Sequence, residues 1–103
     1  MNAVKKAKLE TAGYSVGTVS EFLGLSPCEA ELIETRIALA KMAKSLRSQA
    51  NITQGELAAK IGTDQSRIAK MEAADPGVST DFTLRALYTL GANRRQVAEA
   101  LNA

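Results

Sequence analysis

Apolar residues recur along most of this chain at the spacing of one face of an α-helix, and the runs are separated by residues that typically start or end helices. Residues 57–71 show both features in one stretch. The apolar positions there are Leu57, Ala58, Ile61, Ile68 and Met71. Gly62, a common helix terminator, and Thr63, a common helix starter, interrupt them. The pattern predicts two short helices, the first ending at Gly62 and the second restarting at Thr63.

Capping boxes mark the starts of other helices. In a capping box, a hydroxyl or amide side chain bonds one end amide of the helix, and a Glu or Gln three residues later bonds another. Such pairs begin at Thr18, Ser26, Thr53 and Asn93. Ser26 is followed by Pro27, which favours the first helical position, and no breaker occurs from there to about Ser48. A long helix is therefore expected from Pro27 to about Ser48.

Helix ends are marked by residues that readily adopt the left-handed conformation. The expected ends are Gly24, Asn51, Gly62 and Gly91. One more helix, capped by Ser79, is expected between about Thr80 and Leu90. The last helix carries Val97 and Leu101 on its apolar side.

The composition agrees with a helical fold. Only 4% of the residues are aromatic while 46% are apolar, so the core is built mainly from Leu, Ile and Ala, which suit helices. A chain of 103 residues is expected to form one modest core. We predict an all-α protein in which residues 25–103 form the main domain and residues 1–24 form an N-terminal arm with a short helix.

The composition also limits the function classes. No apolar stretch approaches the ~18 residues of a membrane span, and the basic opening "MNAVKKAKLE" lacks the apolar run of a secretory signal. Cys28 is the only cysteine, so no internal disulfide is possible and a cytoplasmic location is expected. The absence of histidine removes hydrolytic triads and imidazole metal sites. We therefore expect no enzymatic activity, no metal and no cofactor, and we interpret Cys28 as a filler residue.

Positive charge is concentrated in one segment. The formal net charge is +2, but residues 41–70 carry six basic and two acidic side chains, and the segments on either side each sum to −1. Clustered basic residues are typical of a polyanion-binding surface, although a solvated helix face has the same composition. The charge alone leaves both interpretations open.

Two helices joined by so short a turn must cross steeply, as in a helix-turn-helix. At ~100° per residue, one side of the second helix is expected to face inward. That side carries Asp64, Ile68, Met71 and Glu72. The opposite side carries Ser66, Ala69, Lys70 and Ala73, flanked by Gln65 and Arg67. A helix that enters a major groove needs small residues near the bases and Gln, Ser or Lys to read them, but an αα-hairpin with a solvated face has the same spacing.

The stretch "TQGELAAKIGTDQSRIAKME" resembles the helix-turn-helix of the Cro and phage-repressor (XRE-type) family, and the likeness extends through "LRALYTLG" to the C-terminus. The preceding segment "EFLGLSPCEAELIETRIALAKMAKSLR" is similar to the corresponding part of HigA-type antitoxins. The resemblance implies a compact five-helix, lambda-repressor-like bundle that binds double-stranded DNA at a palindromic operator. It also implies a homodimeric transcriptional repressor, often encoded with a toxin partner and repressing its own operon.

The resemblance implies roles for individual residues. Gln65 and Ser66 match base-reading positions, and Lys70 matches a position that touches bases or phosphates. Thr53 and Gln54 match the start of the first helix, which holds a phosphate, and Arg67 is expected at the backbone beside the groove. With the turn residue included, the predicted DNA-contact set is Thr53, Gln54, Thr63, Gln65, Ser66, Arg67 and Lys70.

Two further positions match partners inside the family's fold. Arg47 and Glu72 are expected to form an ion pair in or near the core. The chain departs from the family at residues 73–75, where Ala-Ala-Asp replaces a polar turn, and at Asp64, which adds an acid near the DNA. Both departures predict weaker or differently placed backbone contacts.

One alternative function stays open at this point, a protein-binding adaptor that keeps the fold without specific DNA binding. Glu29, Glu31 and Glu34, together with the apolar stripe of the long helix, would then serve a partner or a dimer seam, although a long helix packed on its own core has the same pattern. For the regulator, the expected dimer seam is the last helix, through Val97 and Leu101, or the N-terminal segment.

Overall fold

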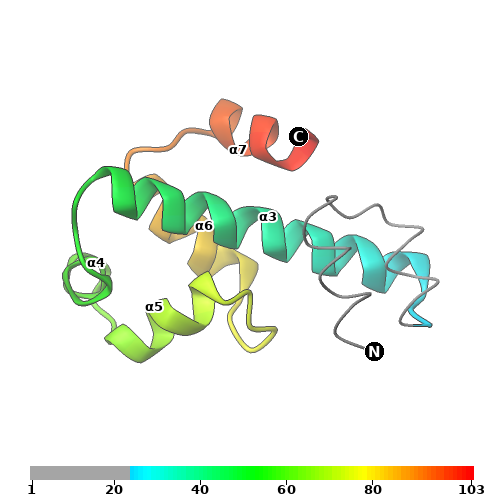
Figure 1. The fold of residues 1–103 in the computed structure, drawn as a ribbon, viewed down its shortest axis with the longest axis horizontal. Coiled ribbons are helices and arrows are strands. Elements are labelled where there is room, and N and C mark those ends of the chain that lie inside the picture. The colour runs from blue at the N-terminus through cyan, green and yellow to red at the C-terminus, as the bar shows by residue number, and fades with distance from the viewer. Residues whose placement is uncertain (1–23) are drawn as a thin grey trace, which may run out of the picture. The chain divides into compact units, whose positions relative to one another are not determined.

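The computed structural model describes residues 24–103, and all regular structure in that range is helical. It contains five helices: α3 (Pro27–Gln49), α4 (Gln54–Ile61), α5 (Gln65–Glu72), α6 (Thr80–Thr89) and α7 (Arg94–Asn102) (Figure 1). The predicted all-α class and five-helix domain are confirmed. The arm and short helix predicted near the N-terminus fall on residues 1–23, outside the described range, so the boundary after residue 24 stays a prediction.

The chain divides into two compact units, residues 1–35 and 36–103, and α3 crosses the division. In the first unit, the predicted capping box at Ser26 is present. The Ser26 Oγ accepts from the Glu29 N–H at 3.2 Å, and the Glu29 Oε1 accepts from the Ser26 N–H at 3.1 Å. The bond from the Ser26 backbone, followed by that from its side chain, lowers the pKa of Glu29 because both stabilise the charged form. Helices α4 to α7 lie wholly in the second unit.

One apolar core holds the second unit together. Its largest fully buried side chains are Leu57 of α4, Ile68 and Met71 of α5, and Leu87 of α6. The second half of α3 adds Leu39 and Ala43, and α7 adds Val97. Each buried side chain of Leu or Ile size contributes about 1.5–3 kcal/mol. Because helices of eight to ten residues are marginal in water, α4, α5 and α6 depend on this shared core.

The helix boundaries follow the capping residues. The boxes predicted at Thr53 and Asn93 are both complete, and Ser79 caps α6 as predicted. Asn51, after the end of α3, has φ 57°, the left-handed conformation expected of it. These ends are local features, so a sequence pattern is enough to locate them.

A three-residue turn joins α4 to α5. Gly62 has φ 86°, and the N–H groups of Gly62 and Thr63 both donate to the Ala58 carbonyl at 2.9 Å. No atom lies within 4 Å of where a Cβ at position 62 would be, so glycine is favoured there by the backbone conformation and not by crowding.

The start of α5 differs from the prediction in two ways. The helix begins at Gln65 and not at Thr63, because Asp64 is its cap, with Oδ1 accepting from the Arg67 N–H at 2.9 Å. Asp64 is also exposed, so its predicted inward placement is wrong. Its backbone is extended, with φ −107° and ψ 164°, and helical angles do not apply to an extended residue.

The two α7 residues predicted to form a dimer seam differ in their exposure to solvent. Val97 belongs to the core and is 7% exposed, whereas Leu101 is 47% exposed. Of these two residues, Leu101 is therefore the more accessible to a second copy of the chain, and the seam itself stays a prediction. Within residues 24–103, no helix is both long and apolar enough to cross a membrane.

Candidate nucleic-acid interface

Helix α5 turns a polar, exposed side away from the core. Ile68 and Met71 are buried, as predicted. The residues predicted to face outward are all exposed: Ser66, Ala69, Lys70 and Ala73, with Gln65 and Arg67 beside them. Because the small side chains on this side leave the helix backbone accessible, the helix has the shape needed to approach a groove closely.

The starts of α4 and α5 meet through two glutamine side chains. Gln54 and Gln65 are the first residues of these helices, and the Gln65 Nε2 donates to the Gln54 Oε1 at 3.3 Å. Thr53 lies beside them as the α4 cap, with its Oγ1 accepting from the Glu56 N–H at 3.0 Å. Three predicted DNA-contact residues therefore come together at adjoining helix starts, where unpaired backbone N–H groups favour anions.

Arg47 and Glu72 form an ion pair next to Gln54. The Arg47 Nε donates to the Glu72 Oε2 at 2.6 Å, and the Arg47 Nη2 donates to Oε1 at 3.1 Å. The Arg47 Nη1 also donates to the Ile52 carbonyl at 2.9 Å. The Glu72 side chain is only 4% exposed and that of Arg47 is 15% exposed. The predicted pair is confirmed, and it joins the end of α3 to the end of α5.

Glu72 has a further partner that the sequence did not predict. The Gln54 Nε2 donates to the Glu72 Oε1 at 3.0 Å, so the glutamine of α4 touches both α5 residues. Burial by itself would raise the pKa of Glu72. Hydrogen bonds from Arg47 and Gln54 and the charges of Arg47 and Lys44 outweigh burial, and they hold the pKa of Glu72 below that of an ordinary glutamate. The hydrogen bond to Glu72 likewise raises the pKa of Arg47. Both side chains are therefore charged near neutral pH.

Arg67 leans from α5 toward α6. Its guanidinium carbon lies 4.5 Å from the centre of the Phe82 ring, a cation–π contact. Such a contact at an exposed site contributes about 0.5–1 kcal/mol and leaves the guanidinium N–H donors free for a phosphate. Since Phe82 is fifteen residues away, only the presence of an aromatic residue in the next helix hinted at this contact.

Thr63 and Lys70 complete the predicted set. Lys70 is exposed on the outward side of α5, whereas Thr63 is half-buried in the turn and its N–H is bonded to the Ala58 carbonyl. Gln54 is half-buried as well, and the other five residues of the set are exposed. Contact of all seven with DNA stays a prediction.

The turn after α5 adopts a glycine-like conformation without a glycine. Ala74 has φ 59°, its N–H donates to the Met71 carbonyl at 3.1 Å, and the Asp75 N–H donates to the Lys70 carbonyl at 3.0 Å. The Asp75 Oδ1 then accepts from the Gly77 N–H at 2.7 Å. The left-handed conformation costs an alanine roughly 1–2 kcal/mol. The Ala-Ala-Asp turn at residues 73–75 thus places strain at the end of α5.

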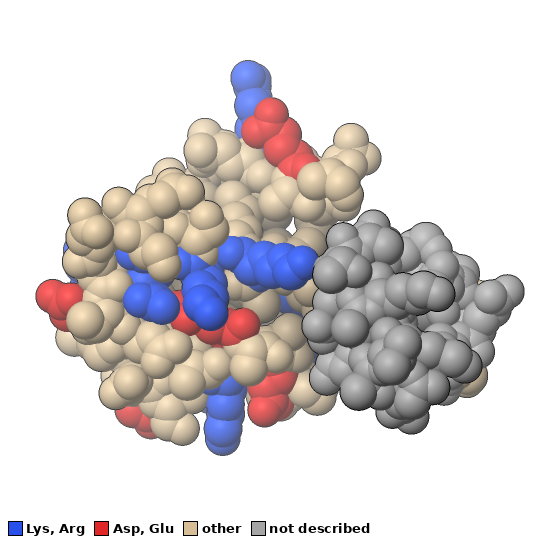
Figure 2. Space-filling view, in the orientation of Figure 1, with Lys and Arg blue, Asp and Glu red and all other residues tan. Residues whose placement is uncertain are grey.

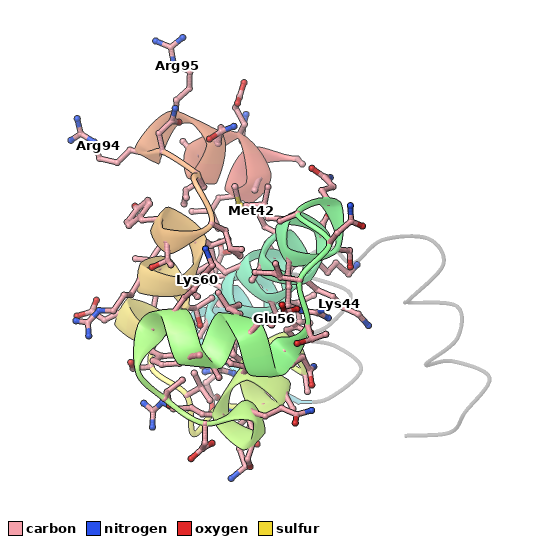
Figure 3. The ribbon with its side chains drawn as sticks, turned by 90° about the vertical axis from the view of Figure 1, so that its left-hand side faces the viewer. Met42, Lys44, Glu56, Lys60, Arg94 and Arg95 are labelled. Atoms are coloured by element: carbon pink, nitrogen blue, oxygen red, sulfur yellow. The ribbon has the colours of Figure 1, made fainter. Side chains whose placement is uncertain are left out.

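Charged side chains of both signs mix on the surface. Figure 2 shows lysine and arginine side chains interspersed with acidic ones on one face of the molecule. In Figure 3, Lys44 and Lys60 project from α3 and α4, while Arg94 and Arg95 extend from the start of α7 at the end opposite α5. Of the labelled basic residues, only Lys60 therefore belongs to the helix-turn-helix itself.

Comparison with known protein families found a match to a helix-turn-helix family. A family described as "Helix-turn-helix domain" matches residues 38–100, from the second half of α3 into α7. The matched range includes the whole predicted DNA-contact set. Searches against curated proteins and against solved structures found no match.

Proposed function

Because the chain belongs to the helix-turn-helix domain family, we propose that it is a non-enzymatic, sequence-specific DNA-binding transcriptional regulator. Helix α5 enters the major groove, with Gln65 and Ser66 reading base edges. Thr53 and Gln54 hold a phosphate at the start of α4, and Arg67 and Lys70 hold phosphates beside the groove.

One observation carries this proposal, the hydrogen bond between Gln54 and Gln65 at two adjoining helix starts. This bond supports the assignment of different DNA contacts to the two residues: Gln54 contacts a DNA phosphate and holds the Gln65 side chain in place, while Gln65 contacts a base. The exposed side of α5, with small residues and Lys70 between polar neighbours, supports the same assignment.

The regulator acts as a repressor and binds as a two-fold homodimer to a palindromic operator. An α5 of eight residues reads only a few base pairs, and useful specificity requires two half-sites about one helical turn apart. Leu101, exposed on α7, is the residue of the predicted seam that is available for this contact.

We further propose that the chain is an antitoxin that represses its own operon and binds a toxin. Support comes from the resemblance of the segment before the helix-turn-helix to HigA-type antitoxins. On that segment, Glu29, Glu31 and the 55% exposed Leu32 offer a surface for a partner.

Selection from random-sequence DNA duplexes tests the proposal. The protein should enrich a palindromic sequence, bind it more tightly than scrambled duplexes of the same length, and lose affinity as salt increases. Light scattering should show a dimer on the selected duplex.

Two results would contradict it. A monomer at high concentration, both free and on DNA, would exclude the two-fold dimer. Millimolar affinity without sequence preference would exclude the specific regulator and favour the protein-binding adaptor, for which co-purification of a partner is the next measurement.

A further inference from the structure

A chain of hydrogen bonds runs from the ion pair to the start of α5. It begins at Arg47, passes through Glu72 and Gln54, and ends at Gln65, with donor–acceptor distances of 2.6, 3.0 and 3.3 Å. The four residues come from α3, α4 and α5. A contact at the core is thereby connected to a side chain on the surface.

The chemistry at the inner end determines the direction of every bond. A guanidinium has donors only, and an ionised carboxylate has acceptors only. Glu72 must accept from Gln54, so the Gln54 Nε2 faces Glu72 and its Oε1 faces Gln65. Gln65 can then only donate to Gln54 through Nε2. Its Oε1 and its second N–H are left for the DNA.

Those two remaining groups match an adenine. In the major groove adenine offers a donor at N6 and an acceptor at N7, whereas guanine offers acceptors at both N7 and O6. We infer that Glu72 is a positioning residue for base reading: by accepting from Gln54, it holds the Gln65 amide in the orientation that prefers adenine. The inference rests on the proposed function, since it requires that Gln65 touch a base.

The substitution Glu72→Gln should reverse the donor–acceptor direction of the hydrogen bonds between residues 72, 54 and 65, and it keeps nearly the same side-chain volume. Arg47 donates to both oxygens of Glu72, and its shorter bond is the one from Nε to Oε2. The new side chain keeps its oxygen at that shorter bond, which places its nitrogen at the position of Oε1, facing Gln54 and giving up the longer bond from Arg47 Nη2. The Gln54 and Gln65 amides then both turn over, and Gln65 presents two N–H donors. Its preference for adenine over guanine should fall by about 5-fold or more, the lower end of what a good bidentate contact supplies.

The experiment compares base preferences of variants on selected duplexes. The wild type selects its site, and the position that loses preference in Gln65→Ala is the base that Gln65 reads. Glu72→Gln is then measured at that position, below the melting transition of the least stable variant. Arg47→Lys is the matched control, because it weakens the ion pair but retains the carboxylate, and adenine preference should persist.

The possible outcomes distinguish a failure of the inference from a failure of the proposed function. Loss of adenine preference in Glu72→Gln, but not in Arg47→Lys, supports the inference. Equal weakening on all sequences makes Glu72 a purely structural residue, and the inference fails while the proposed function stands. If the wild type selects no sequence, both fail. If Glu72→Gln does not fold, Gln54→Leu removes the middle link with the ion pair intact, and unchanged adenine preference in that variant overturns the inference.

Discussion

The two faces of α5 are held in different ways. On the inner face, Ile68 and Met71 are at most 2% exposed and Glu72 is bonded by both Arg47 and Gln54. The outer face consists of exposed small and polar side chains, among them Ser66 and Lys70. Because an eight-residue helix is too short to persist alone, the inner face provides the stability of α5. The outer face is then free to carry residues suited to a ligand, so stability and recognition are assigned to neighbouring positions.

Arg47→Ala should have the largest effect, on the inner face. It leaves the nearly buried Glu72 carboxylate without its main partner, and breaking a buried pair in this way costs about 3–5 kcal/mol. Thermal unfolding followed by circular dichroism should show a markedly lower melting temperature. Lys41→Ala, at an exposed position on the same helix, is the control and should melt close to wild type. If Arg47→Ala melts like wild type yet no longer binds DNA, Arg47 is a DNA contact and our assignment is wrong.

Ile68→Ala and Ser66→Ala compare the two faces within one helix. Ile68 is fully buried, and truncating such a side chain to alanine costs about 2–5 kcal/mol. Ser66 is exposed, so its truncation should change the free energy of unfolding by no more than about 0.5 kcal/mol while weakening operator binding. Denaturant titration and DNA-binding isotherms measure the two effects. A similar loss of stability in both variants would show that residues of the outer face also contribute to the stability of the fold.

The variants Gln65→Ala and Arg67→Ala distinguish a base contact from a phosphate contact on the outer face. A good amide–adenine pair is worth about 1–3 kcal/mol against the wrong base, so Gln65→Ala should narrow the gap between operator and random DNA with little change in salt dependence. Arg67→Ala should weaken both DNAs similarly and reduce the salt slope by about one, because a phosphate contact carries no sequence information. Isotherms at several salt concentrations distinguish them. If the two variants exchange behaviours, the register of α5 in the groove is wrong.

The smallest effects are expected at the two turns that flank α5. Ala74→Gly should stabilise the fold by up to about 1 kcal/mol, because glycine adopts φ 59° without the alanine's penalty but loses more entropy on folding. Gly62→Ala should destabilise by about 1–2 kcal/mol through conformation alone, since its Cβ would meet no atom within 4 Å. Chemical denaturation measures both, and neither change should alter base preference. No gain from Ala74→Gly would mean that the turn is not strained.

The amino-acid sequence by itself determined most of the helix ends of the second unit, although it placed the start of α5 two residues too early. The capping boxes at Thr53 and Asn93, the left-handed Asn51 and the glycine turn at Gly62 all depend on groups within three or four residues of one another. Backbone amides at a helix end are satisfied locally, so the sequence pattern is sufficient. The outward residues of α5 followed from the same helical spacing.

Only the tertiary structure decided how these helices support one another. The bonds from Gln65 to Gln54, from Gln54 to Glu72 and from Arg47 to Glu72 join residues 11, 18 and 25 positions apart. The pair of Arg47 with Glu72 was expected only through family resemblance, and the contact of Arg67 with Phe82 was not expected at all. Such contacts depend on the angles at which helices cross. Those angles come from the packing of Leu57, Ile68, Met71 and Leu87 in one core, which no local pattern specifies.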